Sequence, residues 1–344
     1  MKRKVLITAL CLGFVGFFVG CGLNSKRIDN SKESQLEKEE KNLSIEDLKV
    51  IEEAKIKVQK EEAKKREQEK VERIVVEETR EYRDNIGFYY YNLDTKVEYS
   101  INEDKEFRAA STIKLPLVMM VMDDVYNGKL SLDTILSYNK NTDYEGGTGS
   151  LQHRKKIEKV SVAEAVKLAI TTSDNIAYKM LNRNVSMSIK SYVEKITGVK
   201  IEGTNHLTAK QAMLILKHLY ENPDDNPYYN TIIKHLKNTV FHKTMDKYIP
   251  YEKVAHKIGS YYRYYHDIGI VYGGTDYIMV MYTKDVGELP TDVNIENDSI
   301  LLIDAGALAC EITAKISERI YNMHVEDNSE EKGIIEENIV DKVE

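Results

Sequence analysis

The strand-forming segments of this chain lie at the two ends of a long helical block, and this order limits the folds that it can adopt. Residues 86–91 and 97–101 are β-prone and flank the turn 93–96, which predicts a hairpin. Three more β-rich segments come late, at 253–262, 267–272 and 277–282. Because a lone hairpin is barely stable, we expect the early and late strands to join in one antiparallel sheet.

Between the two sets of strands, hydrophobic residues recur with the period of a helix. The predicted helices are 111–126, 161–172, 175–184, 187–197, 207–222 and 226–238. A long apolar helix from Ser299 to Met323 follows the last strand and is expected to cover one face of the sheet. The order predicts an α+β fold, with an antiparallel five-stranded sheet flanked by helices and a separate all-α lobe.

The first 21 residues have the pattern of a secretory leader. A basic start, Lys2 to Lys4, precedes the apolar stretch Val5 to Val19, which is short for a membrane span of about 20 residues. The stretch ends at Gly20-Cys21, which resembles the lipobox of bacterial lipoproteins and predicts lipidation of Cys21. The alternatives are a simple signal peptide or an uncleaved anchor. In each case we expect the rest of the chain on the extracytoplasmic face of the cell membrane.

Residues 22–85 differ in composition from the rest, since opposite charges are interspersed and apolar residues are sparse. We interpret this segment as a charged tether, partly helical or disordered, that holds a domain away from the membrane and has a possible protein partner. The folded domain is expected over 86–325, followed by an acidic tail, 326–344. The formal net charge of -7 argues against nucleic-acid binding, which needs a positive surface.

The first motif with chemical meaning is Ser111-Thr112-Ile113-Lys114, at the start of a predicted helix. Residues three apart share a helix face, so Lys114 can reach the Ser111 hydroxyl. A serine needs an adjacent base to act as a nucleophile, and a lysine with a depressed pKa can take its proton. Backbone N–H groups at a helix start can also stabilise an oxyanion. Alone, the motif is weak evidence and is more typical of a helix cap followed by a surface lysine.

The second motif is Ser173-Asp174-Asn175, between two predicted helices. The serine can pass a proton to a leaving group, and the asparagine can hydrogen-bond a substrate amide. An ordinary N-cap is the alternative interpretation.

The third motif, Lys257-Ile258-Gly259-Ser260, starts a late strand. Lys257 can hold a substrate carboxylate or tune a neighbouring serine. Gly259 allows a close approach to the backbone, and the Ser260 N–H can be a second oxyanion donor.

Together and in this order, the three motifs resemble the Ser-x-x-Lys, Ser-Asp-Asn and Lys-Thr-Gly set of class A β-lactamases and penicillin-binding proteins. Three surrounding segments are also similar to that family: the nucleophile segment 108–122, the glycine turn 144–149 and the strand 266–271. The resemblance spans about 86–325 and implies a β-lactamase/transpeptidase-like fold.

The resemblance also implies roles for individual residues. The implied catalytic residues are Ser111 as the acylated nucleophile, Lys114 as its base, Ser173 as the proton shuttle and Lys257 as the strand cation. The implied substrate-binding groups are Asn175, Gly259 and Ser260, with the N–H groups of Ser111 and Ser260 as oxyanion donors.

Two departures from the family bear on function. Class A β-lactamases carry a loop glutamate that activates water for deacylation, but here residues 198–206 run straight into the next helix and Glu202 is their only carboxylate. Ile258 stands where the family has a hydroxyl that bonds the β-lactam carboxylate. Losing one such bond costs about 1.5–3 kcal/mol. His256, just before Lys257, is expected to pack or face solvent, and would lower the lysine pKa if it were protonated.

We therefore expect a class A-type serine hydrolase that a β-lactam or a peptidoglycan-related amide acylates at Ser111, with weak or atypical deacylation. One alternative is a non-catalytic surface module that binds muropeptides or a protein partner. Another makes the tether the functional part. No metal or other cofactor is expected, because the histidines and cysteines show no ligand spacing and no phosphate-binding glycine loop is present.

Overall fold

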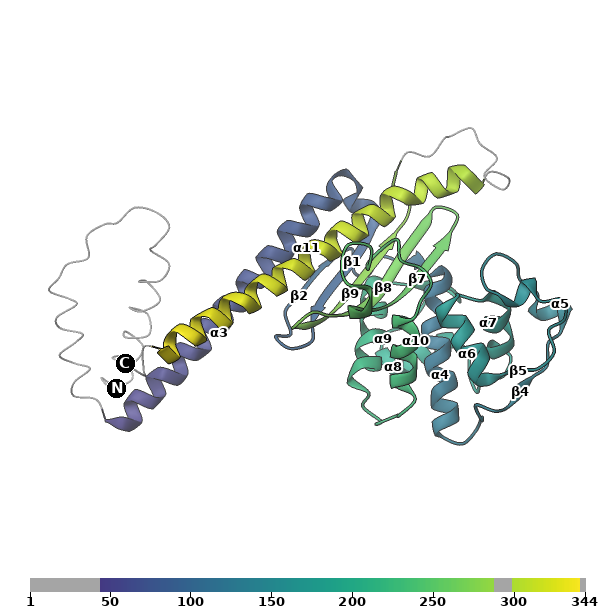
Figure 1. Cartoon of the computed structure of the whole chain (residues 1–344), viewed down its shortest axis with the longest axis horizontal. Helices are drawn as coiled ribbons and strands as arrows, with labels where there is room; N and C mark the ends of the chain where they lie inside the picture. The colour runs from purple at the N-terminus through teal and green to yellow at the C-terminus, as the bar shows by residue number, and fades with distance from the viewer. Residues whose placement is uncertain (1–43, 288–298, 341–344) are drawn as a thin grey trace. The chain divides into compact units, whose positions relative to one another are not determined.

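The structure is a computed structural model that describes residues 44–287 and 299–340, with side chains over 44–287 and 306–326 (Figure 1). The chain divides into two compact units, residues 1–69 and 70–344. The predicted leader and Cys21 lie outside the described residues. None of the described helices is both long and apolar enough to cross a bilayer.

The described part of the first unit is helical. Helix α3 (Ile45–Thr79) begins there, and its start is fixed by Ser44, whose side chain accepts from the Asp47 N–H at 3.2 Å while Asp47 accepts from the Ser44 N–H. Ile45, Leu48 and Ile56 are exposed, so this stretch shows no continuous buried apolar seam.

The second unit is built on a five-stranded antiparallel sheet that combines the two ends of the sequence. Its strands, in spatial order, are β2 (Glu98–Ile101), β1 (Ile86–Asn92), β9 (Asp276–Thr283), β8 (Tyr264–Tyr272) and β7 (Val254–Tyr261). The sheet confirms the predicted pairing of early and late strands. The central strands are apolar on both faces because both faces are covered.

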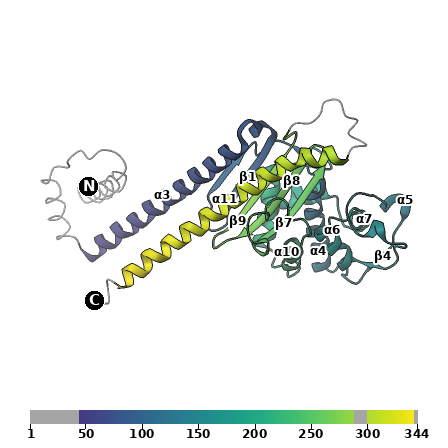
Figure 2. The same cartoon turned by 45° about the horizontal axis from the view of Figure 1, so that its top comes forward.

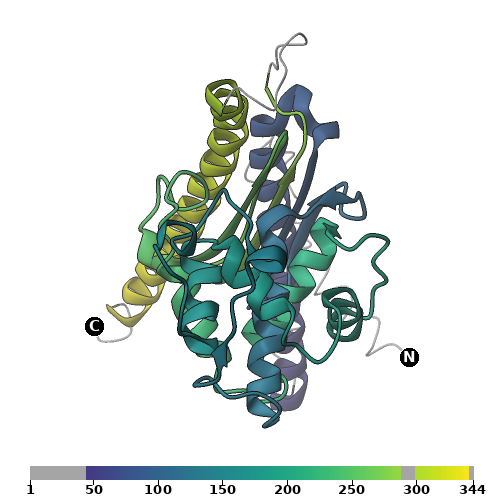
Figure 3. The same ribbon diagram turned by 90° about the vertical axis from the view of Figure 1, so that its right-hand side faces the viewer.

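One face of the sheet carries the helical lobe, which faces the viewer in Figure 3. Its helices are α4 (Lys114–Tyr126), α5 (Lys140–Asp143), α6 (Val162–Thr171), α7 (Asn175–Asn182), α8 (Ile189–Thr197), α9 (Ala209–Glu221) and α10 (Tyr229–Lys237). Two small ladders join distant loops: β3 (Phe107–Arg108) with β6 (His206–Leu207), and β4 (Ile135–Leu136) with β5 (Val160–Ser161). Helix α4 is buried on nearly all sides, which explains its uninterrupted apolar run.

The opposite face is covered by helix α11 (Ser299–Val340), which lies along the strands in Figure 2. Ile312, Ile316 and Ile320 point into this second core, which Val71 and Val75 of α3 complete. The apolar pattern predicted an end at Met323, but the helix continues to Val340. Good helix formers and the absence of proline favour this extension. Short 3-10 turns complete the unit: η2 (Arg80–Asn85), η3 (Ala110–Ile113), η4 (Leu151–His153) and η5 (Tyr251–Lys253).

Candidate active site

The Ser111 hydroxyl is presented by a short turn between a strand and the central helix of the lobe. Residues 110–113 form η3 and α4 starts at Lys114, so the predicted single helix has a 3-10 first turn. Ala110 has a φ of 49°, which is unfavourable for a residue with a Cβ. The turn is fixed to the sheet because the Thr112 hydroxyl lies 2.7 Å from the Ala109 carbonyl and 2.9 Å from the Tyr282 hydroxyl. Ser111 is therefore held in one orientation by its neighbours.

Lys114 is buried, with only 3% of its surface exposed, and its amine is the hub of the site. The Nζ atom lies 3.0 Å from Ser111 Oγ, 2.6 Å from the Ser173 carbonyl and 2.6 Å from Asn175 Oδ1. Burial lowers the pKa of Lys114 to about 7, although Glu145 and Asp174 act to raise it. An amine with this pKa is neutral in half of the molecules near neutral pH, so it can accept the Ser111 proton.

Ser173 lies between two buried lysines. Its Oγ is 3.2 Å from Lys114 Nζ and 2.9 Å from Lys257 Nζ, while Lys257 also donates to the Ile258 carbonyl at 2.9 Å. Burial, reinforced by the charge of Lys114, holds the pKa of Lys257 well below its usual range. Ser173 itself has a φ of 53° and is buried. The three groups form a continuous path along which a proton can move.

The middle residue of the second motif has a structural role. Asp174 caps α7 by accepting from the Ala177 N–H at 3.0 Å, and its other oxygen accepts from the Leu151 N–H at 2.8 Å. Gly149, with a φ of 104°, packs so closely against Asp174 that a Cβ there would clash. The N-cap interpretation thus describes Asp174.

Asn175 is held against the glycine turn. Its Nδ2 donates to the Gly146 carbonyl at 2.8 Å, while its Oδ1 accepts from Lys114. Because both ends of this amide are engaged, its orientation toward the cleft is fixed.

Strand β7 forms the opposite wall and is the edge strand of the sheet. A Cβ at Gly259 would lie 2.9 Å from the Ala109 carbonyl oxygen and 3.0 Å from Thr112 Cγ2, so the glycine allows β7 to pack against η3. The chain's own backbone, rather than a ligand, makes the close approach predicted at Gly259. Ser260 is exposed beside this contact, and both Ile258 and Ser260 line the cleft. Among the described strands, none pairs with the outer edge of β7, so backbone polar groups on that edge are not used by the sheet.

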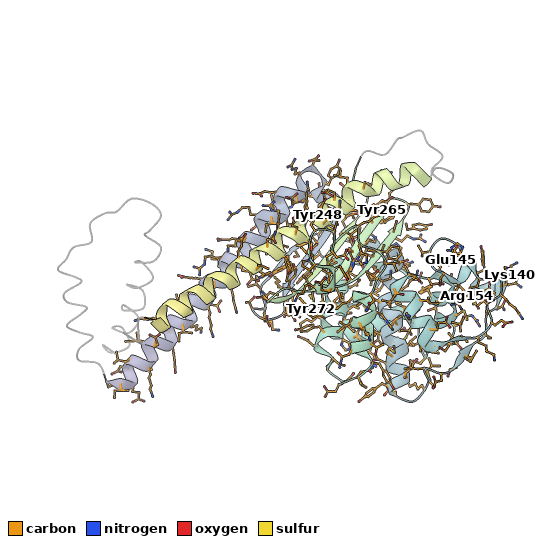
Figure 4. The ribbon with its side chains drawn as sticks, viewed as in Figure 1. Lys140, Glu145, Arg154, Tyr248, Tyr265 and Tyr272 are labelled. Atoms are coloured by element: carbon orange, nitrogen blue, oxygen red, sulfur yellow. The ribbon has the colours of Figure 1, made fainter. Side chains whose placement is uncertain are left out.

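The cleft has a volume of about 330 Å³ and brings together Ser111, Lys114, Ser173, Asn175, Ile258 and Ser260. Glu145, labelled in Figure 4, is the one carboxylate among the described residues that line it, and it pairs with Lys179 at 3.0 Å. Glu202 is exposed and does not line the cleft, because its segment leads directly into β6. Within the described residues, the cleft therefore has no carboxylate free to activate water beside Ser111.

On the other face of β7 lies a charged cluster of His256, Asp246 and Asp267, which the three motifs do not predict. His256 is fully buried, with its Nδ1 2.8 Å and its Nε2 3.3 Å from carboxylate oxygens of Asp267 and Asp246. Burial acts to lower the pKa of His256, but the two carboxylates outweigh it and raise the pKa to about 10. Asp267 also accepts from the Thr244 hydroxyl and the Met245 N–H. His256 is therefore a charged residue that ties β7 to β8 and to the loop after α10.

The comparisons with known proteins agree with this geometry. The model of the β-lactamase enzyme family matches residues 67–322, most of the chain. This chain belongs to the β-lactamase enzyme family. No curated protein sequence matches it.

Solved structures of β-lactamase-like proteins share the fold at low sequence identity. The structure of PBP-A is 20% identical, with a TM-score of 0.62, and the match covers 74% of this chain and 95% of that one. An acyl-enzyme complex of a PBP-A variant with penicillin G is 21% identical, with a TM-score of 0.61 and coverage of 74% and 96%. A β-lactamase from Sphaerobacter thermophilus DSM 20745 is 19% identical, with a TM-score of 0.61 and the same coverage.

The predicted family and the predicted fold class are both confirmed. The chain is a class A-like serine hydrolase in family and in fold. The structure also brings the three motifs, far apart in the sequence, to one cleft. His256, Asp246 and the lining residues Arg108 and Asn205 are the parts of this region that the motifs did not identify.

Proposed function

We propose that this β-lactamase-family chain is an extracytoplasmic enzyme whose Ser111 is acylated by β-lactams or by peptidoglycan-related amides, and that the acyl group is released slowly. The observation that carries the proposal is the buried Lys114 amine, which lies 3.0 Å from Ser111 Oγ with its pKa lowered to about 7. A nucleophile beside a base of matched pKa is the requirement for acyl transfer by serine.

In the proposed reaction, neutral Lys114 takes the hydroxyl proton as Ser111 Oγ bonds to the carbonyl carbon of the substrate. The carbonyl oxygen becomes an oxyanion near the free edge of β7, where the Ser111 and Ser260 N–H groups are the expected donors. The carbon–nitrogen bond then breaks, and the nitrogen takes a proton from the Ser173 hydroxyl. Ser173 regains a proton from Lys114 through the contacts described above. The products are an ester on Ser111 and an amine, which leaves from a linear amide and stays attached to the acyl group when a β-lactam ring opens.

Slow release of the ester is proposed from what surrounds it. Hydrolysis needs a base that takes a proton from water, and the one described carboxylate in the cleft, Glu145, is paired with Lys179. Ile258 offers no hydroxyl to a β-lactam carboxylate, so acylation by β-lactams is expected to be less efficient than with a hydroxyl there. The substrate in the cell is therefore proposed to be a peptidoglycan-related amide.

The test is labelling of the full chain with a fluorescent penicillin, followed by intact-mass and peptide mapping. We expect one adduct, on Ser111, that forms faster than it decays and is absent from the Ser111→Ala variant. If neither an adduct nor hydrolysis of any β-lactam or ester is observed, the chain is instead a binding module for muropeptides or a protein partner.

The location outside the cytoplasm is proposed from the leader. Lipid attached at Cys21 would anchor the chain to the membrane, with the charged segment as its tether. Metabolic labelling with a fatty acid should mark the wild type and leave Cys21→Ser unlabelled, and an unlabelled wild type would contradict the anchor.

A further inference from the structure

Arg108 lines the cleft and is held in place by its neighbours. It belongs to β3, where it pairs with His206 of β6, and its carbonyl oxygen lies 2.8 Å from His266 Nε2. Its guanidinium lies over the ring of Tyr261, at 3.8 Å from the ring centre. Stacking on an aromatic ring fixes the plane of the guanidinium and leaves its edge free for a ligand.

This cation has no anionic partner among the described residues, and its Nε is shielded from solvent without a hydrogen-bond partner. Asn205 also lines the cleft, and its Oδ1 atom is likewise shielded from solvent without a hydrogen-bond partner. Arg263, two residues beyond Tyr261, differs because Asp285 pairs with it at 2.5 Å. Buried polar groups nearly always have partners, so two residues that line one cleft and each carry an unpartnered polar atom indicate a place for a polar ligand.

Strand β7 shows which part of a substrate would reach Arg108. Its Lys257 contacts Ser173, and Tyr261, which stacks on Arg108, follows four residues later, roughly 13 Å along the strand at 3.3 Å per residue. In the proposed reaction the leaving group departs toward Ser173, which protonates it. The acyl part must then extend the other way, toward Tyr261 and Arg108.

We propose that Arg108 binds a carboxylate on the acyl part of the substrate, and that Asn205 accepts a hydrogen bond from a nearby amide N–H of that same part. The inference rests on the proposed acylation of Ser111 and names its substrate class: an acyl donor, such as an acidic peptide, with a carboxylate away from the scissile bond. The planar guanidinium matches a carboxylate through two parallel hydrogen bonds.

Benzylpenicillin and carbenicillin form a matched pair for this test, because they differ by one carboxylate on the acyl side chain. The second-order rate constant for acylation would be measured with both compounds on the full chain. In Arg108→Gln, the ratio of the carbenicillin to the benzylpenicillin rate constant should fall roughly tenfold to a hundredfold, as expected for the loss of a charge-assisted bond. Arg108→Lys keeps the positive charge without the planar pair of donors, so this ratio should fall less than in Arg108→Gln. Arg263→Gln is the matched control and should leave the ratio unchanged.

An unchanged ratio in Arg108→Gln, or an equal fall in Arg263→Gln, would overturn the proposal. A second measurement separates it from the proposed function: calorimetric binding of both penicillins to Ser111→Ala and to the double variant Ser111→Ala/Arg108→Gln. If the wild type is never acylated, the proposed function fails, but a preference for carbenicillin that disappears in the double variant still supports the carboxylate site. Equal affinities of Ser111→Ala for the two compounds contradict it.

Discussion

His256 and Lys257 are adjacent on β7, equally buried, and opposite in their surroundings. Side chains of neighbouring strand residues point to opposite faces, so His256 lies on the α11 side, whereas Lys257 points the other way and contacts Ser173. His256 lies between two carboxylates that raise its pKa to about 10. Lys257 shares Ser173 with another lysine and has a lowered pKa.

The comparison teaches that burial alone does not decide whether a group is charged. On the back of the strand, carboxylates stabilise a cation that holds the structure together. On the front, burial without a contacting carboxylate lowers the pKa of Lys114 and of Lys257. We infer that the front serves chemistry and the back serves stability, and each prediction below tests that division.

The largest effect is expected from Lys114→Met, which removes the proposed base. Acylation of Ser111 by a fluorescent penicillin should fall roughly 10²- to 10⁴-fold, the usual contribution of a positioned base, with no loss of folding stability. Lys210→Met is the matched control, since this surface lysine pairs with Glu103 at 3.0 Å, and its rate should stay near that of the wild type. If Lys114→Met were labelled at the wild-type rate, Lys114 would not be the base, and the proposed chemical role of this face would be wrong.

His256→Gln should affect stability instead. Removing the cation leaves Asp267 with only its hydrogen bonds from Thr244 and Met245, and Asp246 with only His242. Breaking a buried ion pair typically destabilises a protein by about 3–5 kcal/mol, and these remaining contacts place the expected loss toward the lower end. Urea unfolding measures this change. His235→Gln on α10 is the control. The pKa of His235 is lowered by burial and by Lys167 and Lys234, whereas carboxylates raise the pKa of His256. Because no buried ion pair is lost, the free energy of unfolding should fall by only about 1 kcal/mol. If His256→Gln lost acylation while keeping its stability, the division between the two faces would be wrong.

The pH dependence of acylation should follow Lys114. The amine must be neutral to act as a base, so the rate should fall about tenfold per pH unit below 7 and level off above it. Stopped-flow acylation between pH 5.5 and 8 measures the profile, with circular dichroism at each pH to confirm folding. A flat profile would show that another group takes the proton.

The pH dependence of stability should have opposite signs for the two faces. The pKa of His256 is raised on folding, so its contribution is fully present below about 6.5 and is lost as pH rises through about 10. The pKa of Lys114 is lowered, so its burial penalty is greatest below about 7 and disappears as pH rises toward 10.5. The stability difference between wild type and His256→Gln should therefore shrink from pH 6.5 to pH 10. A difference that grew with pH would contradict the assignment of charge to His256.

The smallest effect is expected from Ile258→Thr, which restores a hydroxyl at the cleft. Penicillin acylation should rise about tenfold through one added charge-assisted hydrogen bond. Ile258→Val keeps the branched shape without the hydroxyl and should not reproduce the gain. Equal rates in both variants would show that space, and not hydrogen bonding, limits β-lactams at this position.

Periodicity and motif order predicted the sheet, the helical lobe and the residues that meet at Ser111. These features depend on local patterns, which a single sequence displays. The His256 cluster was not predicted, because Asp246 comes from an irregular loop, and Asp267 meets the histidine only through the pairing of β7 with β8. Arg108 was visible in the nucleophile segment, but its lack of a partner depends on the three-dimensional arrangement. The close contact at Gly259 likewise needs the placement of η3.

The positive φ angles of Ala110 and Ser173 have a consequence for how this protein can adapt to heat. Each such conformation costs on the order of 1–3 kcal/mol and is maintained by the surrounding structure. Glycine at either position would relieve that strain, yet it would loosen the turn before Ser111 or delete the Ser173 hydroxyl. Selection for thermal stability alone would thus favour substitutions at these two positions that lower the activity. A more heat-resistant relative that keeps the activity is therefore expected to gain its stability elsewhere, in the two cores on either side of the sheet.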